Sequence, residues 1–464
     1  MKTLFVDVAI LGFGTSGMNA YRSAAKHTQN IVVVQNGPYG TTCARVGCMP
    51  SKLLISAADA AFTLEEAPGF GVFPGGDTKI YGRQVLERVR SLRDAFVEHV
   101  LSSVEKIPEE QRILGTARFI SDTEVLVDDH TKIQAKAFVV ATGSSPRLLP
   151  HAELLGDRHI VNDDVFEWDH LPESVAVFGT GVIGMELGQA LKRLGVRVTL
   201  FGRSGNVAAF TDPDLQQIAN DLFHRELDVF PGATVQEMKR EGDQVHVLFT
   251  DAKGVEYEKQ FEYILSAIGR VPNIADLNLE KTSLKRSGKG MPLFDAETMQ
   301  CGESNIFFAG DVNGQKALLH EASDEGDIAG ENAALFPHVL KGHRRVPLAV
   351  VFTDPEMGSC GASFSELEPG TFVTGKIDFS TQGRSRILNK NKGMLHVYAE
   401  KKTGKILGAE MIGPRAEHLL HLIAWSIGFS ATASDLLKMP FYHPTVEEGI
   451  RTALRDIEKQ RKGK

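Results

Sequence analysis

The sequence predicts an α/β protein, because a pattern of apolar strand, glycine turn, helix and second apolar strand occurs twice in it. The first copy has a β-branched run at 6–11, a helix-like stretch at 18–26 and another apolar run at 31–34. The second copy covers 174–201, and its glycine turn begins 167 residues after the first one (179 − 12). Continuous apolar runs of this length are typical of parallel strands buried on both faces of a sheet. We therefore expect two Rossmann-like folds.

Each turn has the spacing Gly-x-Gly-x-x-Gly. In this arrangement the first glycine permits the bend, the second lets the backbone approach a pyrophosphate, and the third packs the helix on the strand. The pyrophosphate then rests on N–H groups of the helix. One match carries little weight in a chain with 45 glycines, but two matches framed by strand and helix predict two dinucleotide sites rather than the turns of a ligand-free sheet. The glycines are Gly12, Gly14 and Gly17 in the first copy and Gly179, Gly181 and Gly184 in the second.

Composition narrows the class of protein. The 464 residues are 42% hydrophobic, ample for about three domains. The net charge of −8 argues against a broad phosphate-binding face, so nucleic acid is not an expected partner. No apolar run reaches membrane-spanning length and the first residues show no signal-peptide layout, so we expect a cytoplasmic enzyme without a membrane partner. Cys301 and Cys360 are isolated and are expected to be packing thiols.

The other two cysteines, Cys43 and Cys48, are five residues apart and follow the first glycine turn. On a regular helix such residues are about 8–9 Å apart at Cα, beyond the about 4.4–6.8 Å that a disulfide spans, so a disulfide requires a distorted turn at Cys43. Gly47 supplies backbone freedom, and Pro50 suits the opening of a helix. A helix start and Arg45 would stabilise a thiolate. The pattern favours a redox-active disulfide over inert thiols or half of a metal site, and no metal is expected.

The glycine turns are accompanied by motifs at 40–52, 141–143, 269–273, 305–311, 352–356 and 443–448, in an order that resembles one enzyme family. Over nearly its whole length the chain resembles the flavoprotein pyridine nucleotide-disulfide oxidoreductases, which include dihydrolipoyl dehydrogenase and glutathione reductase. The resemblance implies an FAD-binding domain at 1–150, an NAD(P)-binding domain at 151–272, a second part of the FAD-binding domain at 273–346, and a C-terminal α+β dimerisation domain at 347–464. A basic, proline-flanked connector supports the last boundary.

The resemblance also implies where the cofactors bind. The first fingerprint would hold the ADP half of FAD, with Asp311 on the ribityl chain, and the second would hold the nicotinamide nucleotide. An NAD enzyme is expected to have an acidic residue on the ribose at the end of the next strand, whereas this chain has Arg203, which suits a 2′-phosphate; NADP therefore stays open beside NAD. In the FAD fold Gln35 replaces the usual glutamate, and an amide bonds a ribose more weakly. The other expected cofactor contacts are Thr42, Lys52, Thr142, Gly143, Gly269, Arg270 and Gly310.

Catalytic roles follow from the same resemblance. Cys43 would be the thiol that meets the substrate, and Cys48 the thiol next to the flavin. Lys52 and Glu186 match a pair at the flavin N5, unless they are two separate surface charges. Because a buried ion pair adds little net stability, the expected role of this pair is to orient and polarise the flavin.

His443 is the expected general base. A lone histidine is usually packed or solvated, but Pro444 suits the first position of a helix, which we expect over 444–458 with His443 near its N-cap. In the family the carboxylate five residues later, here Glu448, orients the imidazole and supports its protonated form. Such a pair can take a proton from an attacking dithiol near neutral pH. Relatives bring this base to the cysteines of a second subunit, which implies a homodimer.

These assignments imply that an electron pair passes from a small-molecule dithiol through Cys43 and Cys48 and FAD to a nicotinamide nucleotide. Dihydrolipoamide and NAD are the expected pair, since Gly184 is typical of NAD-using members; membership of a 2-oxoacid dehydrogenase complex stays open. The alternative is an NADPH-dependent reductase of glutathione or another small disulfide, and Phe441, which stands where a second histidine is common, points to a divergent branch. The cysteine pair disfavours a transhydrogenase, and the intact base disfavours a flavin-binding subunit without catalysis.

Overall fold

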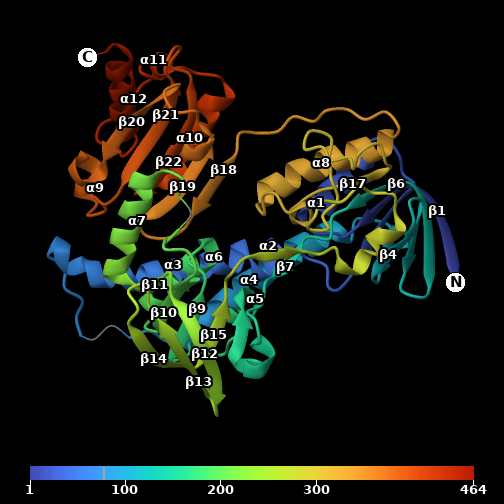
Figure 1. Cartoon of the computed structure of the whole chain (residues 1–464), viewed down its shortest axis with the longest axis horizontal. Helices are drawn as coiled ribbons and strands as arrows, with labels where there is room; N and C mark the ends of the chain where they lie inside the picture. The colour runs from blue at the N-terminus through green and yellow to red at the C-terminus, as the bar shows by residue number, and fades with distance from the viewer. Residues whose placement is uncertain (77–78, 209, 464) are drawn as a thin grey trace. The chain divides into compact units, whose positions relative to one another are not determined.

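The computed structural model of the chain describes residues 1–76, 79–208 and 210–463 (Figure 1). Its contacts divide it into two compact units. The first unit consists of Met1–Pro50, Val89–Arg147 and Gly269–Arg344, and the second of Ser51–Arg88, Leu148–Ile268 and Arg345–Lys464. The two units are therefore each assembled from three separate stretches of sequence.

The first unit is built on a sheet with parallel central strands. Its strand order is β3-β2-β1-β6-β5-β4, and β17 also pairs with β6. Strand β1 is parallel to both neighbours, with Ile10 opposite Val33 and Val139. These residues are fully buried, as expected for strands covered on both faces. The strands are β1 (Lys2–Leu11), β2 (Ile31–Gln35), β3 (Arg112–Leu114), β4 (Ala117–Ser121), β5 (Glu124–Val127), β6 (Thr131–Val140) and β17 (Ile306–Phe308).

Helices α1 (Thr15–Ala24) and α8 (Leu319–Leu335) lie side by side in this unit (Figure 1). Glycines allow their close approach, because a Cβ at Gly326 would lie 2.3 Å from the carbonyl oxygen of Ser16 and one at Gly330 would lie 2.2 Å from that of Ala20. The remaining elements of the unit are α2 (Thr42–Val46), the paired strands β7 (Ser144–Pro146) and β16 (Arg270–Pro272), and the 3-10 helices η2 (Glu109–Gln111), η4 (Ala275–Leu277), η5 (Leu279–Lys281) and η6 (Asp311–Asn313). Helices α3 (Cys48–Glu66) and α4 (Gly82–Val104) each have residues in both units.

The second unit contains the second nucleotide fold. All strands of its sheet are parallel, in the order β11-β10-β9-β15-β8, and a three-stranded antiparallel sheet, β12-β13-β14, accompanies it. The strands are β8 (His159–Val161), β9 (Ser174–Phe178), β10 (Arg197–Gly202), β11 (Asp228–Pro231), β12 (Thr234–Glu241), β13 (Gln244–Thr250), β14 (Glu256–Phe261) and β15 (Tyr263–Ser266). The helices are η3 (Ala152–Arg158), α5 (Asn162–Val165), α6 (Val182–Arg193) and α7 (Pro213–Glu226), and 3-10 helix η1 (Ala67–Phe70) follows α3.

The C-terminal part of the second unit is an α+β layer. An antiparallel sheet, β18-β19-β22-β21-β20, packs its apolar face on α10 and α12 around one large core. The elements are β18 (Leu348–Val351), β19 (Glu356–Gly361), η7 (Phe364–Glu366), β20 (Phe372–Asp378), η8 (Phe379–Thr381), α9 (Gly383–Ile387), β21 (Met394–Glu400), β22 (Ile406–Gly413), α10 (Ala416–Gly428), α11 (Ala433–Leu436) and α12 (Glu448–Arg461). The predicted class, two Rossmann-like folds followed by an α+β domain, is confirmed.

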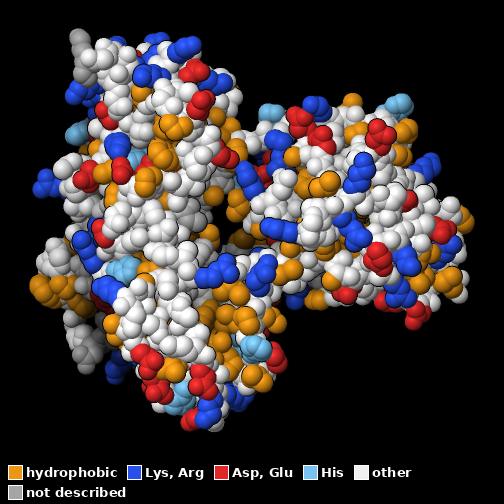
Figure 2. Space-filling model, viewed as in Figure 1, with side chains coloured by type: hydrophobic (Ala, Val, Ile, Leu, Met, Phe, Trp, Pro, Cys, Tyr) orange, Lys and Arg blue, Asp and Glu red, His pale blue; other side chains and the backbone are white. Residues whose placement is uncertain are grey.

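On the face seen in Figure 2, Lys and Arg side chains are interspersed with Asp and Glu side chains. Among the described helices, none has an apolar stretch long enough to cross a membrane.

Candidate redox and nucleotide sites

Cys43 and Cys48 lie on two different helices. Cys43, which is half-buried, is the second residue of α2, and the exposed Cys48 begins α3. Gly47 separates the helices: its φ of −123° and ψ of −117° are not helical, and a Cβ there would lie 3.0 Å from the carbonyl oxygen of Thr42. The break thus lies at Gly47, whereas Cys43, which was expected in a distorted turn, lies within α2. Helix α3 begins two residues before the expected Pro50. The side chain of Thr42 is exposed.

The three glycines of the first fingerprint have distinct surroundings. Gly12 has a φ of +96°, and a Cβ there would lie 2.4 Å from the carbonyl oxygen of Ala141. A Cβ at Gly17 would lie 2.0 Å from the carbonyl oxygen of Gly12, whereas one at Gly14 would meet nothing within 4 Å. The first and third glycines are thus required by packing, and the second faces open space, which is the arrangement that lets a phosphate approach the backbone.

The start of α1 fits a pyrophosphate. Its N-cap residue, Gly14, provides no side-chain cap for the first N–H groups. Beside them the Oγ of Ser16 is buried and has no hydrogen-bond partner among the described residues. Unsatisfied donors at a helix N-terminus attract anions. The residues present therefore fit a dinucleotide bound here.

Gln35, at the end of β2, holds the fingerprint turn in place. Its Oε1 accepts a hydrogen bond from the backbone N–H of Phe13 at 2.8 Å, and its Nε2 donates to the carbonyl oxygens of Asn36 and Pro38 at 3.2 and 3.3 Å. An amide oxygen has two lone pairs, so one remains for the ribose contact expected from the sequence.

Two motifs far apart in sequence meet at the 141–143 turn. The Oγ1 of Thr142 donates to the carbonyl oxygen of Asn273 at 2.7 Å, and the Nδ2 of Asn273 donates back to the carbonyl oxygen of Thr142 at 2.9 Å. The N–H of Asn273 donates to the carbonyl oxygen of Gly143 at 3.0 Å. The 269–273 motif is thus bound to this turn inside the first unit.

Asp311 belongs to the same network. The Oγ of Ser144 donates to Asp311 at 2.9 Å and accepts from the Nε of Arg270 at 2.8 Å. Before Asp311, Gly310 has a φ of +82°, and its N–H donates to the buried carboxylate of Glu325 at 2.8 Å. Burial raises the pKa of Glu325 above its ordinary value. The structure therefore places Arg270, and Gly269 before it, in the unit that holds Asp311.

The second fingerprint repeats the geometry of the first. Gly179 has a φ of +122°, and a Cβ there would lie 2.2 Å from the carbonyl oxygen of Ala267. A Cβ at Gly184 would lie 1.9 Å from the carbonyl oxygen of Gly179, and one at Gly181 would meet nothing within 4 Å. Arg203 follows the last residue of β10; it is exposed and has no ion-pair partner in the described ranges.

Lys52 and Glu186 form an ion pair. The Nζ of Lys52 lies 2.7 Å from the Oε2 of Glu186, and the exposed fractions of the two side chains are 34% and 4%. The other carboxylate oxygen of Glu186 accepts from the N–H of Phe352 at 2.9 Å. The two residues are therefore not separate surface charges.

His443 and Glu448 are also paired. The Nδ1 of His443 lies 2.9 Å from the Oε2 of Glu448. Because a carboxylate only accepts, Nδ1 donates in this contact, and Nε2 is the ring atom through which His443 could take a proton. The His443 side chain is 80% exposed. Desolvation opposes ionisation of Glu448, but hydrogen bonds from the N–H of Thr445 and from His443 hold its pKa below the ordinary value.

The expected helix over 444–458 is wrong at its start, since α12 begins at Glu448. The Glu448 carboxylate reaches back to the N–H of Thr445 at 3.3 Å, and the hydroxyl of Thr445 donates to the carbonyl oxygen of Tyr442. These bonds hold the residues after His443 as a turn, so the imidazole is oriented by a side chain of the first helical turn.

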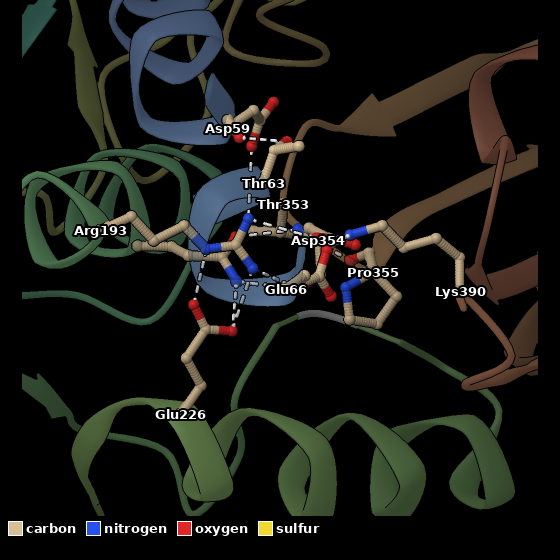
Figure 3. Close-up of polar contacts among 10 residues, drawn as sticks. Asp59, Thr63, Glu66, Arg193, Glu226, Thr353, Asp354, Pro355 and Lys390 are labelled. Carbon is tan, nitrogen blue, oxygen red and sulfur yellow. Dashed lines mark hydrogen bonds and ion pairs between the residues drawn. The ribbon is translucent and has the colours of Figure 1, made fainter. Parts of the chain in front are cut away.

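Sequence reasoning missed a cluster of charged side chains beside the Lys52–Glu186 pair. Arg193, on the same face of α6 as Glu186, contacts Asp59, Glu226 and Asp354 (Figure 3). The signal was present as polar residues at 186, 189 and 193, spaced as on one face of a helix.

Cys301 and Cys360 lie in apolar cores, and burial raises the pKa of each thiol to about 12. They are therefore protonated at neutral pH and fit the packing role that we expected.

Family models match most of the chain. The model described as pyridine nucleotide-disulphide oxidoreductase matches residues 6–326, and the model of that family's dimerisation domain matches 347–454. The chain belongs to the pyridine nucleotide-disulphide oxidoreductase family. Members are flavoproteins that use FAD and NAD(P), so the two fingerprints belong to an oxidoreductase with these cofactors, and the dimerisation domain supports a homodimer.

Relatives in the family align over nearly the whole chain. Dihydrolipoyl dehydrogenase of Thermus scotoductus is 30% identical over 471 residues, covering 99% of this chain and 98% of that protein. Dihydrolipoyl dehydrogenase 2 of Haloarcula marismortui is 29% identical over 463 residues, covering 97% and 96%. The solved structure of LpdA from Mycobacterium tuberculosis is similar with a TM-score of 0.82 at 26% identity, covering 98% of this chain and 99% of that one. The Cu(II) complex of the flavoprotein disulfide reductase RclA from Escherichia coli also has a TM-score of 0.82, at 19% identity and 97% and 99% coverage, and shows the same fold.

Proposed function

We propose that this enzyme is a dihydrolipoyl dehydrogenase, which oxidises dihydrolipoamide or a similar small dithiol and reduces NAD⁺. The overall reaction converts dithiol and NAD⁺ to disulfide, NADH and one proton. The names of the aligned relatives support this substrate. Cys43 and Cys48 supply the matching chemistry when they are joined as a disulfide.

The His443–Glu448 pair carries the proposal. Its carboxylate is charged at neutral pH and binds Nδ1, and the imidazole is mostly exposed, so Nε2 can serve as the base. A module that only binds flavin has no need of an oriented and accessible base. An enzyme that oxidises dithiols needs such a base, because the thiolate is the attacking species.

The chain's residues exchange sulfur bonds in two steps. The first step starts from the oxidised enzyme, in which Cys43 and Cys48 form a disulfide. A substrate thiolate, formed as Nε2 of His443 takes its proton, attacks the Sγ of Cys43, which breaks the Cys43–Cys48 bond, and Cys48 leaves as a thiolate. The second substrate thiol then displaces Cys43, so the substrate closes to a disulfide and both cysteines are reduced. When bound, FAD supplies the route by which this electron pair reaches the nicotinamide nucleotide. In the homodimer we propose, the base comes from one subunit and the cysteines from the other.

One observation favours a second candidate, an NADPH-dependent reductase of glutathione or another small disulfide. Arg203 lies exposed after β10, where a 2′-phosphate is recognised, and it has no ion-pair partner in the part of the chain that the structure describes. An unneutralised guanidinium at this place suits NADPH better than NADH.

Steady-state assays separate the two candidates. The purified flavoprotein is offered lipoamide or glutathione disulfide with NADH or NADPH, and dihydrolipoamide with NAD⁺ or NADP⁺. We expect the highest kcat/KM with the lipoamide couple and NAD(H). Faster turnover of glutathione disulfide with NADPH would replace this assignment with the second candidate, and no turnover of any dithiol or disulfide would refute both.

We further propose domain boundaries at 150/151, 272/273 and 346/347. Pairing of β7 with β16 supports the first two, because it returns the chain to the first unit near residue 270. A cytoplasmic location is also proposed, because it suits a catalytic cysteine pair in a chain whose other two cysteines are buried thiols.

A further inference from the structure

One face of α6 carries three buried polar side chains, Glu186, Gln189 and Arg193. They are 4%, 4% and 6% exposed, and spacings of three and four residues place them on the same side of the helix. Burying charged groups is costly unless each is paired. All three bind the segment 352–354, which follows β18 and lies against this face.

Phe352 contacts both members of the Lys52–Glu186 pair. Its N–H donates to the Oε1 of Glu186 at 2.9 Å, which leaves Oε2 to accept from the Nζ of Lys52 at 2.7 Å. Its ring centre lies 4.8 Å from the same ammonium nitrogen, a cation–π contact. The direction of the Lys52 ammonium therefore depends on where Phe352 lies.

Asp354, two residues later, is held by three side chains. Its N–H donates to the Oε1 of Gln189 at 2.8 Å, and the Nε2 of Gln189 donates back to the carbonyl oxygen of Asp354 at 2.9 Å. Its Oδ2 accepts from the Nζ of Lys390 at 2.8 Å and from Arg193 at 3.2 Å (Figure 3). Burial opposes ionisation of this carboxyl, but Lys390 and Arg193 hold the pKa of Asp354 below its ordinary value.

Arg193 also ties this segment to the helix that carries Lys52. Its guanidinium lies 3.3 Å from the carboxylate of Asp59 and 3.7 Å from the ring centre of Phe62, both on α3. Asp59 follows Lys52 by seven residues, as Arg193 follows Glu186 on α6. Two ion pairs about 10 Å apart thus join the two helices, with Phe352–Asp354 bound between them on α6.

We propose that Gln189 and Arg193 are positioning residues, which act through Asp354 and Phe352 to set the direction of the Lys52 ammonium. The inference rests on the proposed function, and with it we propose that the Lys52 ammonium lies at the flavin N5, as expected from the sequence. If the segment 352–354 shifts, the Phe352 N–H no longer occupies the second oxygen of the Glu186 carboxylate. Lys52 then has two oxygens to pair with and is no longer held in one direction.

The test is Arg193→Met in the FAD-loaded enzyme, with Arg158→Met as a matched control. Arg158 pairs with Asp243 at 2.6 Å and Glu262 at 3.8 Å, its side chain is 14% exposed, and no contact links it to the segment 352–354. Arg193→Met is expected to lower kcat for dithiol oxidation about tenfold at unchanged KM, since a misplacement of about 1 Å can cost about 100-fold. It is also expected to shift the visible absorption band of the flavin, and Arg193→Lys to restore that band in part. Arg158→Met is expected to leave both unchanged.

A double-mutant cycle decides whether Arg193 acts through Lys52. Lys52→Met is expected to have the larger effect, and adding Arg193→Met to it is expected to change the flavin spectrum no further. Additive shifts would overturn the proposal, and so would an Arg193→Met enzyme with the kcat and spectrum of the Arg158→Met control. If Arg193→Met binds no FAD, Gln189→Leu is measured in the same cycle with the same expectation. Failure of the proposed function would be seen separately, because the unmodified enzyme would then not turn over dithiols. The double-mutant cycle does not depend on that turnover, since it is measured from the absorption spectrum of the flavin.

Discussion

Gly184→Ala tests how closely α6 must pack on the second glycine turn. A Cβ at Gly184 would lie 1.9 Å from the carbonyl oxygen of Gly179, and real Cβ contacts are essentially never shorter than 3.0 Å. The helix must therefore move by about 1.1 Å (3.0 − 1.9). Overpacking costs about 1–3 kcal/mol, whereas alanine gains up to about 1 kcal/mol over glycine in a helix. The strain prevails, and the free energy of unfolding is expected to fall by about 1–2 kcal/mol.

Two other glycines of the same segment provide controls. A Cβ at Gly188 would lie 3.1 Å from the Cδ2 of Leu200, which is the end of a flexible side chain, so the gain in helix propensity is expected to prevail there. A Cβ at Gly181 meets nothing within 4 Å. Gly181→Ala is therefore expected to leave stability unchanged and to weaken nucleotide binding, because the methyl group occupies the space where a pyrophosphate approaches.

The assay is thermal unfolding of the FAD-loaded protein by circular dichroism at one scan rate, with fluorescence titration of NADH and NADPH. The apparent unfolding temperature of Gly184→Ala is expected to fall by about 1–2 °C, at about 1 °C per kcal/mol for a chain of 464 residues. Gly188→Ala is expected to unfold at or above the temperature of the unmodified protein. The reasoning is refuted if Gly184→Ala unfolds with the unmodified protein, or if Gly181→Ala binds both nucleotides as tightly as before.

Four further outcomes are expected. Cys48→Ser should abolish disulfide turnover and leave FAD bound; retained turnover by the variant would exclude this thiol from the reaction. His443→Gln should lower dithiol oxidation about 100-fold or more, the usual worth of a general base, at an unchanged unfolding temperature because the side chain is exposed; a normal rate would remove the proposed base. Arg203→Glu should raise the KM for NADPH about tenfold relative to the KM for NADH, because a charged hydrogen bond is lost. An unchanged ratio of the two KM values would show that Arg203 does not bind the 2′-phosphate. The pKa of Asp354 is lowered in the folded protein, so the stabilisation by its charge is present above the ordinary pKa and is lost as the pH falls through the lower folded value. Asp354→Asn should therefore make the unfolding temperature fall less steeply between pH 6 and pH 3. An unchanged slope would contradict the proposed role of this charge.

Local patterns predicted the nucleotide folds well, because the strand, turn, helix and second strand that identify each fold lie within about thirty consecutive residues. The apolar runs at 6–11 and 174–178 became β1 and β9, and the glycines after them have the packing that a Rossmann turn demands. A break near Cys43 and Cys48 was predictable only from the expectation that they form a disulfide, which residues five apart on a regular helix cannot do.

Features that depend on a single distant side chain were not predictable in the same way. The start of α12 was placed at Pro444 because proline favours a first helical position, but the Glu448 carboxylate bonds back to the preceding turn and delays the helix. The partners of Arg193 come from three separate stretches of sequence, so its spacing on α6 indicated a buried polar face without naming what lies against it.

The outward position of His443 has a consequence for enzyme concentration. In the homodimer we propose, this exposed imidazole meets a pair of catalytic cysteines only when a second copy of the chain supplies them. We therefore expect specific activity to fall on dilution in step with the loss of dimer, so that assembly itself sets how much of the protein is a working catalyst.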